Sequence, residues 1–345
     1  GNTMNNKKIA VLGTGANGSS VAADLIRTGH DVVMIDQWAE HVEKMRADGL
    51  TINMPDETVH VQPDAYHLSD LATMNMQFDY VFLLVKAYDT RWACELIKPY
   101  LKDDGLLVGI QNAMMLDDIV DILGASRTIG CVVELSSEIF SPGVVQRNTT
   151  PSHTWFGLGS VDESTAGREV EIKEMLKHAG KVAISPEIVA AKWMKLVVNT
   201  MCLGPFAMLG LTLYEAVKMP GMRDFALQAG TEALAVGQSL GHTIQPIFGL
   251  TPEDVKDTNR LLEKMLDKLA ADIGPAARDC VLQDHLKGRY SEVDLINGLV
   301  VEESENLGRT APVNKAILDI TQKIQAGELE PDPSNLALAQ EMARA

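Results

Sequence analysis

The sequence has little cysteine, few aromatic residues and fewer basic than acidic residues. Its four cysteines lie far apart in 345 residues, with no Cys-x-x-Cys pair and no Cys/His cluster. We therefore expect free thiols, no bound metal and a reducing, cytoplasmic location. Lys and Arg number 30 against 47 Asp and Glu, which gives a formal net charge of −17. Such acidity disfavours nucleic acid and anionic membrane surfaces as partners.

Long uninterrupted hydrophobic runs are also scarce. Residues 196–213 carry no charge over 18 positions, but they include Asn199, Gly204, Pro205 and Gly210. A helix interrupted by Gly-Pro suits a buried element between domains better than a membrane span. The sequence therefore predicts no membrane partner.

A glycine-rich motif, Gly-Thr-Gly-Ala-Asn-Gly, occupies residues 13–18. An apolar run precedes it, a helix-like stretch follows it, and a second apolar run, residues 31–35, leads into Asp36. This strand–turn–helix–strand order, with an acid 18 positions past the last glycine, matches the dinucleotide-binding fingerprint. We therefore expect the positive end of the first helix to face a pyrophosphate.

Five of the six positions of this loop have a predicted part in cofactor binding. Gly13 allows the tight turn, Gly15 allows close approach of the backbone to the pyrophosphate, and Gly18 allows close helix–strand packing. Ala16 and Asn17 complete the cofactor-binding loop. The alternative is an ordinary glycine-rich turn with no ligand.

Asp36 bears on the choice of dinucleotide. A carboxylate at the end of the second strand can accept hydrogen bonds from both ribose hydroxyls and repels a 2′-phosphate. Residues 37–40 include no base. The sequence therefore favours NAD(H) over NADP(H). The alternative is that Asp36 only caps a helix beginning near Trp38.

The coarse pattern of the chain predicts two domains. Strand-like and helix-like segments alternate in the first half, which indicates a mostly parallel, doubly wound sheet. Helical periodicity dominates from Glu187 onward. We predict an α/β Rossmann-type domain over 4–185, an all-α substrate and catalytic domain over 186–345, and an active site between them.

More detailed expectations concern individual segments. Residues 51–54 and 58–61 are expected to form a hairpin, and 143–146, 154–157 and 181–184 are expected to be antiparallel strands. Helices are expected near 187–203, 219–240, 252–271, 291–307 and 312–326.

Two polar segments of the helical half could carry chemistry. Lys195 and Asn199 are four residues apart and would share one helix face. A lysine entering an apolar stretch loses its proton more readily, which suits a general acid, although it could simply extend to solvent at the helix edge. The second candidate is the segment with Ser291 and Glu292. The alternative for both residues is structural, with Ser291 and Asp294 forming a helix-capping box and Glu292 in the first turn.

Polar residues also follow two buried strands, at Lys86 and at Asn112. They lie where a nicotinamide would bind, and the alternative is that they are ordinary loop residues.

Taken together, these segments resemble the ketopantoate reductase (2-dehydropantoate 2-reductase) family, and this chain is similar to a divergent member. The matching segments fall in the family's order between about residues 7 and 326: Gly13 to Gly18, Lys86-Ala87, Gln111-Asn112, Ser141 to Val145, Lys192 to Asn199, Ser291 to Gly298 and Ala311 to Asn314.

The resemblance implies roles for these residues. Lys195 would protonate the ketone oxygen as the hydride arrives, and Glu292 would engage a substrate hydroxyl. Asn199 would also contact the substrate. Asn112 and Lys86 would help to hold the cofactor ribose and the reacting centre. The implied activity is reduction of 2-dehydropantoate or a related 2-oxo acid by NAD(P)H, or the reverse oxidation.

Three positions depart from the family pattern. Leu203 stands where the family usually has a second asparagine, and Ala113 where it has a glycine. Cys280 stands where the family has a substrate-binding serine, so Cys280 is expected to contact the substrate. Members also commonly use NADPH, with a basic residue near the position of Asp36. Loss of two polar contacts would cost about 1–3 kcal/mol each if their partners stay buried. We therefore expect a substrate that is less polar at one end.

Two other functions remain open at this point. One is a dehydrogenase of a different hydroxy acid on the same architecture, although no His–Asp pair of the opine dehydrogenase kind is apparent. The other is an NAD(H)-binding regulator without turnover, which the presence of both Lys195 and Glu292 disfavours. Family members are often dimers, which is the only basis for expecting a homodimer.

Overall fold

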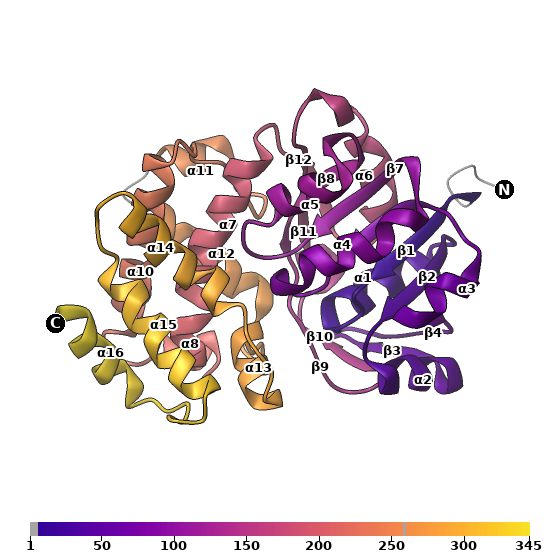
Figure 1. The fold of residues 1–345 in the computed structure, drawn as a ribbon. Coiled ribbons are helices and arrows are strands. Elements are labelled where there is room, and N and C mark those ends of the chain that lie inside the picture. The colour runs from indigo at the N-terminus through magenta and orange to yellow at the C-terminus, as the bar shows by residue number, and fades with distance from the viewer. Residues whose placement is uncertain (1–5, 258–259) are drawn as a thin grey trace. The chain divides into compact units, whose positions relative to one another are not determined.

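The computed structural model of the chain describes residues 6–257 and 260–345, drawn in Figure 1. The described residues divide into two compact units: one contains those up to residue 111 and residues 115–189, and the other contains residues 112–114 and those from residue 190 onward. Strands belong to the first unit and the second is helical, which confirms the predicted α/β domain followed by a helical part. The assignment of a cofactor role to one and a catalytic role to the other stays a prediction.

An eight-stranded sheet forms the centre of the first unit, in the order β12-β11-β8-β7-β6-β1-β2-β5. Its strands are β1 (Lys8–Leu12), β2 (Asp31–Asp36), β5 (Asp64–His67), β6 (Phe78–Leu83), β7 (Leu101–Ile110), β8 (Thr128–Glu134), β11 (Trp155–Ser160) and β12 (Lys181–Ile184). The inner strands are nearly continuous apolar runs with side chains buried on both faces, as in parallel sheets covered by helices.

The helices of this unit are α1 (Ala16–Arg27), α2 (Ala39–Asp48), α3 (Leu71–Met74), α4 (Thr90–Ile97), α5 (Leu116–Leu123) and α6 (Glu169–Leu176). One strand prediction was wrong: β12 pairs in parallel with β11, not antiparallel. The reason is that α6 lies between these strands in the chain, and a helical crossover returns the chain in the same direction. Strand β11 itself pairs antiparallel with β8, as predicted.

The strand order reverses at β1, which pairs with β2 on one side and β6 on the other. The chain runs from β1 outward to β2 and β5, then returns across β1 to β6 and β7. Loops at the carboxyl ends of the strands diverge at such a reversal, and ligands of open α/β sheets bind there. The glycine loop follows β1 and Lys86 lies shortly after β6, so both lie at this edge of the sheet.

A smaller, four-stranded sheet has the order β4-β3-β10-β9. Its strands are β3 (Leu50–Asn53), β4 (Thr58–Val61), β9 (Ser137–Ser141) and β10 (Val144–Arg147). The β3–β4 hairpin was predicted. By contrast, β10 is only partly antiparallel: it pairs antiparallel with β9 and parallel with β3. Helix α1 contacts this small sheet as well as β1 and β2.

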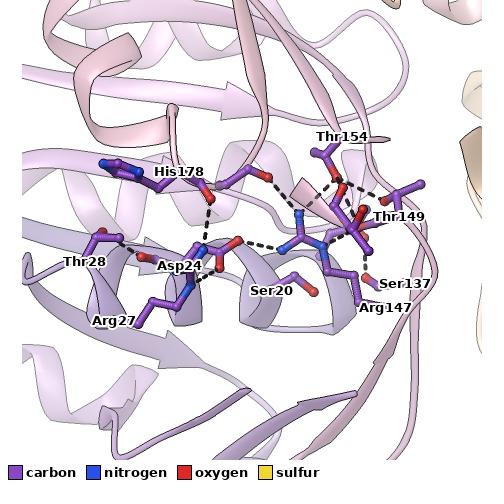
Figure 2. Close-up of polar contacts among 12 residues, drawn as sticks. Ser20, Asp24, Arg27, Thr28, Ser137, Arg147, Thr149, Thr154 and His178 are labelled. Carbon is purple, nitrogen blue, oxygen red and sulfur yellow. Dashed lines mark hydrogen bonds and ion pairs between the residues drawn. The ribbon is translucent and has the colours of Figure 1, made fainter. Parts of the chain in front are cut away.

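A buried arginine ties the small sheet to α1 (Figure 2). The Arg147 side chain is 1% exposed, and its Nη1 donates to Asp24 Oδ2 at 2.6 Å. Its Nη2 donates to Thr154 Oγ1 at 3.0 Å and to the Ala179 carbonyl at 2.8 Å. Asp24 also accepts from Arg27 Nε at 2.7 Å. The guanidinium therefore joins α1, β10, the start of β11 and the end of α6.

The second unit is built from helices, which are α8 (Gly204–Ala207), α9 (Leu213–Ala216), α10 (Met222–Ser239), α11 (Pro252–Lys256), α12 (Leu261–Ile273), α13 (Cys280–Lys287), α14 (Asn297–Asn306), α15 (Pro312–Gln325) and α16 (Asn335–Arg344), together with most of α7 (Ile188–Cys202). The break predicted at Gly204-Pro205 is present between α7 and α8. The helix predicted over 252–271 includes residues 258 and 259, which lie outside the described residues, and the described parts form α11 and α12. No helix in the described part of the chain is long and apolar enough to cross a membrane.

Candidate functional site

The loop between β1 and α1 has the shape that its glycines predict. Gly13 has φ +90°, a conformation that side chains rarely adopt, and a Cβ there would lie 2.6 Å from the Val85 amide nitrogen. A Cβ on Gly18 would lie 2.0 Å from the Gly13 carbonyl oxygen. At Gly15, by contrast, a Cβ would meet nothing within 4 Å. The fold itself therefore requires glycine at positions 13 and 18, whereas Gly15 has open space beside it.

The N-terminus of α1 carries the features of an anion site. Gly15 is the N-cap and provides no side-chain cap, and the first turn contains no acidic residue. The first amide groups of a helix have no partner within it and carry a partial positive charge. Ala16 and Asn17 form the start of this turn, and Asn17 Oδ1 accepts a hydrogen bond from Ser137 Oγ at 2.6 Å. This end of α1 can therefore hold a phosphate group.

Asp36, at the end of β2, is joined to the glycine loop. Its Oδ2 accepts from the Thr14 amide at 3.0 Å and from Thr14 Oγ1 at 2.7 Å. Its Oδ1 accepts from the Trp38 amide at 3.2 Å. Helix α2 begins at Ala39 and has no side-chain cap, so the capping alternative for Asp36 was wrong. Thr14, fully buried, is a partner that the fingerprint did not single out.

The ends of β6 and β7 are joined by a side-chain amide. Gln111 Nε2 donates to the Val85 carbonyl at 2.9 Å and to Thr90 Oγ1 at 3.0 Å. Lys86, half-buried, begins the turn between these elements, and its carbonyl accepts from the Asp89 amide at 2.8 Å. Gln111 therefore fixes the loop that carries Lys86.

The next two residues, Asn112 and Ala113, belong to the second unit by their contacts. Asn112 Nδ2 contacts Cys280 Sγ at 3.9 Å. Ala113 has φ +68°, a left-handed conformation that favours glycine. Ala113 therefore holds a backbone conformation that costs about 1–3 kcal/mol, and a glycine, which the family resemblance implies for this position, would adopt it without that strain.

Helix α7 presents Lys195, Asn199 and Cys202 on one face, since their spacing follows the helical repeat. The Lys195 ammonium lies 5.8 Å from the ring centroid of Phe248. Asn199 is 2% exposed, and its Nδ2 has no hydrogen-bond partner among the described residues. A buried amide without a partner costs about 1–3 kcal/mol, which a bound polar ligand would recover. Leu203, immediately after α7, is 8% exposed.

The N-terminus of α13 lies near this face. Burial raises the pKa of the Cys202 thiol to about 12, while the nearby Lys195 charge opposes the shift and that of Asp279 adds to it. Asp279 Oδ1 accepts from the Leu282 amide at 2.9 Å, and its Oδ2 is buried without a partner in the described chain. Burial raises the pKa of Asp279 well above its usual range. The sequence pattern gave no signal for Asp279, although its neighbour Cys280 was predicted to contact substrate.

The segment that carries Glu292 differs from the predicted helix start. Ser291 Oγ accepts from the Val293 amide at 3.4 Å, and no capping box with Asp294 forms. A short 3-10 turn covers Val293–Leu295, and α14 begins only at Asn297. The capping alternative for Ser291 and Glu292 was therefore wrong. Glu292 is 5% exposed, so its carboxylate is held within the protein.

Two asparagines of the matching segments instead join helices. Asn297 Nδ2 donates to the Thr200 carbonyl of α7 at 3.2 Å and to Asn314 Oδ1 of α15 at 2.9 Å. Asn314 Nδ2 donates to Glu232 Oε1 of α10 at 2.9 Å. These bonds fix α7, and therefore Lys195 and Asn199, against α14 and α15.

Family models cover most of the chain. The model described as "Ketopantoate reductase PanE/ApbA" matches residues 9–160, and the one described as "Ketopantoate reductase PanE/ApbA C terminal" matches residues 187–325. Curated relatives named 2-dehydropantoate 2-reductase include one from Pyrococcus horikoshii, 26% identical, which aligns over 89% of this chain and 94% of its own length. Another, from Mesorhizobium japonicum, is 27% identical over 92% of this chain and 97% of its own length.

Solved structures show the same fold. A D-mandelate dehydrogenase in ternary complex with NADH and anilino(oxo)acetate is similar with TM-score 0.82 and 20% identity, over 93% of this chain and 99% of that one. A ketopantoate reductase of the PanE/ApbA family from Ralstonia eutropha JMP134 is similar with TM-score 0.76 and 23% identity, over the same shares.

Proposed function

Because the chain belongs to the ketopantoate reductase PanE/ApbA family and is an NAD(P)-dependent oxidoreductase acting on a CH–OH group, we propose that it interconverts a 2-oxo acid and its 2-hydroxy acid with Lys195 as general acid and base. The observation that carries this proposal is the face of α7, where Lys195 stands one turn from the buried Asn199 Nδ2, which has no hydrogen-bond partner among the described residues. A cation and a free donor on one helix face suit a carbonyl oxygen that gains negative charge.

The loop after β1 fits a dinucleotide. Open space at Gly15 and the uncapped start of α1 suit a pyrophosphate, which the amides of Ala16, Asn17 and Gly18 would contact. The bound nicotinamide would supply or accept the hydride. Lys86 and Asn112 would position its ribose and the reacting carbonyl, as the family resemblance implies.

In the reductive direction, Lys195 Nζ gives a proton to the carbonyl oxygen as the hydride reaches carbon. The Lys195 ammonium lies over the ring of Phe248, 5.8 Å from its centroid, and the attraction of the ring face for a cation helps to hold Nζ in place. Asn199 Nδ2 donates to the substrate, and Glu292 accepts from a substrate hydroxyl. In the oxidative direction Lys195 takes the proton back.

The side chains near this centre favour a substrate with an apolar end. The family resemblance implies a serine and an asparagine at two of these positions. Here Cys280 has a weakly polar thiol in place of the serine hydroxyl, and Leu203 has an aliphatic chain in place of the asparagine amide. A buried polar group of 2-dehydropantoate would lose hydrogen bonds at these positions, each worth about 1–3 kcal/mol when its partner stays buried.

The direct test is a steady-state screen of 2-oxo acids and 2- or 3-hydroxy acids with aliphatic, aromatic and hydroxylated side chains, against NADH and NADPH. We expect turnover of at least one 2-oxo acid, with 2-dehydropantoate a poor substrate. Dinucleotide binding without turnover of any compound would contradict the proposal and would favour a regulator that binds NAD(H) without catalysis.

Two glycine variants separate the fold of the loop from its contact with the cofactor. We expect Gly15→Ala to leave the unfolding midpoint unchanged but to weaken dinucleotide binding about tenfold, because its methyl group enters the open space. Gly18→Ala should instead destabilise the domain by at least about 1–3 kcal/mol, since its Cβ collides with the Gly13 carbonyl. Chemical denaturation and fluorescence titration measure the two effects. Equal dinucleotide affinity of Gly15→Ala and the wild type would contradict the proposal that the pyrophosphate binds at this loop.

Asp36 is proposed to favour NADH over NADPH through charge repulsion of a 2′-phosphate. We expect Asp36→Asn to tighten NADPH binding about tenfold, about 1.4 kcal/mol, with a smaller effect on NADH. The matched control is Asp31→Asn at the start of the same strand, which removes an equal charge paired with Lys8. Dissociation constants from titration decide the matter, and tighter binding of NADPH than NADH by the wild type would refute the preference.

A further inference from the structure

His41 of α2 lies at the centre of a hydrogen-bonded chain beneath the glycine loop. The side chain is fully buried. Its Nδ1 is 2.9 Å from the amide nitrogen of Gly143, in the turn between β9 and β10, and its Nε2 is 3.1 Å from Ser19 Oγ of α1. Ser19 Oγ in turn lies 2.8 Å from the Thr14 carbonyl. The imidazole therefore connects the small sheet to the loop that follows β1.

The partners fix which atom carries each proton. The Gly143 amide can only donate, so His41 Nδ1 must accept and the ring proton must lie on Nε2. Nε2 then donates to Ser19 Oγ, which leaves the Ser19 hydroxyl to donate to the Thr14 carbonyl. Only the neutral imidazole satisfies every bond of this chain.

The far end of the chain is the candidate cofactor site. Thr14 lies between Gly13 and Gly15, and its amide and hydroxyl both donate to Asp36 Oδ2. Trp38, which donates its amide to Asp36 Oδ1, stacks on the His41 ring with 5.2 Å between centroids. One imidazole therefore supports both the peptide of the glycine loop and the segment after Asp36.

We propose that His41 is a positioning residue for the dinucleotide: in its neutral form, with the proton on Nε2, it holds the loop at residues 13–18 and Asp36 in the geometry that binds the cofactor. The segment Ser141-Pro142-Gly143 thereby belongs to the support of the cofactor site, because Gly143 provides the bond that selects this tautomer. The inference rests on dinucleotide binding at this loop, as set out above.

Burial favours the neutral form of His41 at pH 7. It lowers the pKa of His41, while the nearby Asp36 carboxylate and a hydrogen bond with the Thr14 backbone oppose that shift in part. Ser19 and Thr14 are uncharged, and the turn at residues 141–143 contains no titratable group. Lys44, on the same helix, packs its stem beside Gly143.

Strand β5 also packs on α2, and its titratable groups bond residues other than His41. His67 bonds Glu43, and Asp64 bonds the Tyr66 hydroxyl. In an unfolded chain His41 would titrate at its ordinary pKa, so its contribution is present above that pKa and is lost as the pH falls through the lower folded value. Protonation puts a hydrogen on Nδ1 that faces the Gly143 N–H, and the chain of bonds breaks.

Two substitutions each keep one hydrogen bond of the His41 ring and remove the other. In His41→Asn the amide oxygen can take the place of Nδ1 and accept from Gly143, whereas in His41→Gln the amide nitrogen can take the place of Nε2 and donate to Ser19. We expect each to raise the KM and dissociation constant of the dinucleotide about tenfold, the factor of one lost hydrogen bond, with kcat changed less than about twofold at saturating cofactor. His67→Gln, a histidine that also contacts α2, is the matched control and should leave both constants unchanged.

The pH dependence gives a second readout. In the wild type, dinucleotide affinity should fall as the pH drops below the ordinary histidine pKa of about 6.5, and this fall should be absent in His41→Asn and His41→Gln. Unchanged cofactor affinity in both variants, or the same acid limb in them as in the wild type, would overturn the inference. Dinucleotide binding is measured here without substrate, so failure of the wild type to bind at any pH would instead refute the proposed function.

Nitrogen-15 NMR of histidine in the wild-type protein keeps the inference testable if both variants fail to fold. We expect His41 to show an unprotonated Nδ1 and a protonated Nε2 at pH 7. The opposite tautomer, or a charged ring, would overturn the inference.

Discussion

Replacing Lys195 with alanine is expected to lower kcat by about 10²–10⁴ on the protein's best 2-oxo acid. The reason is that oxygen gains negative charge as hydride reaches the carbonyl carbon, and without Lys195 the α7 face has lost the cation that is proposed to meet this charge. The dinucleotide dissociation constant should stay within about twofold of the wild type, because the glycine loop and Asp36, which are proposed to hold the dinucleotide, are unchanged in this variant. Single-turnover kinetics and fluorescence titration measure the two quantities.

Two further variants make this result specific. Lys195→Arg keeps the positive charge but cannot release a proton at neutral pH, so it should also be slow. Lys315→Ala on α15 removes a surface lysine that pairs with Asp319 at 3.0 Å, and it should turn over normally. Near-normal turnover by Lys195→Ala would show that Lys195 takes no part in the chemical step.

Replacing Arg147 with alanine is expected to destabilise the first unit by about 3–5 kcal/mol. The change leaves the Asp24 carboxylate, 4% exposed, without its buried partner and strips donors from Thr154 and the Ala179 carbonyl. Figure 2 shows the Asp24 carboxylate and the Thr154 side chain on two sides of this guanidinium. The measurement is the free energy of unfolding in denaturant, followed by a probe of the first unit.

Arg27 provides a matched control, because it contacts the same carboxylate. Its side chain is 35% exposed and bonds Asp24 Oδ1, so Arg27→Ala should cost less than about 1 kcal/mol while Arg147 stays paired. The double variant Arg147→Met, Asp24→Leu should recover much of the lost stability, since well-packed apolar residues can replace a buried ion pair. If Arg147→Ala lowers the free energy of unfolding no more than Arg27→Ala does, burial of the Arg147–Asp24 pair has little effect on stability.

Sequence patterns were sufficient for the local features of the cofactor loop. The steric need for glycine at positions 13 and 18 and the end of β2 at Asp36 follow from spacing and alternation alone. The broken helix at Gly204-Pro205 follows from the backbone limits of proline. Such features depend on neighbours close in sequence, which is why a pattern can predict them.

Features that depend on distant partners were not predicted. The direction of β12 depends on the crossover through α6, and the bonds of His41 join residues 102 and 22 positions apart. Asp279 has no sequence signal, since its raised pKa arises from burial in the folded chain. Ser291 to Asp294 has the pattern of a capping box, but α14 begins at Asn297, whose side chain is held by Thr200 and Asn314. Tertiary hydrogen bonds thus decided where this helix starts.

The roles of Lys195, Asn199, Glu292 and Asp36 stay predictions, and one measurement tests their common premise most directly. The protein is incubated with a nicotinamide cofactor carrying deuterium at the hydride position and with the 2-oxo acid that turns over best, and the hydroxy acid is analysed by mass spectrometry. The account predicts one deuterium on the carbon that bears the new hydroxyl. Cofactor binding without label in any hydroxy acid, across the whole panel of 2-oxo acids, would contradict it.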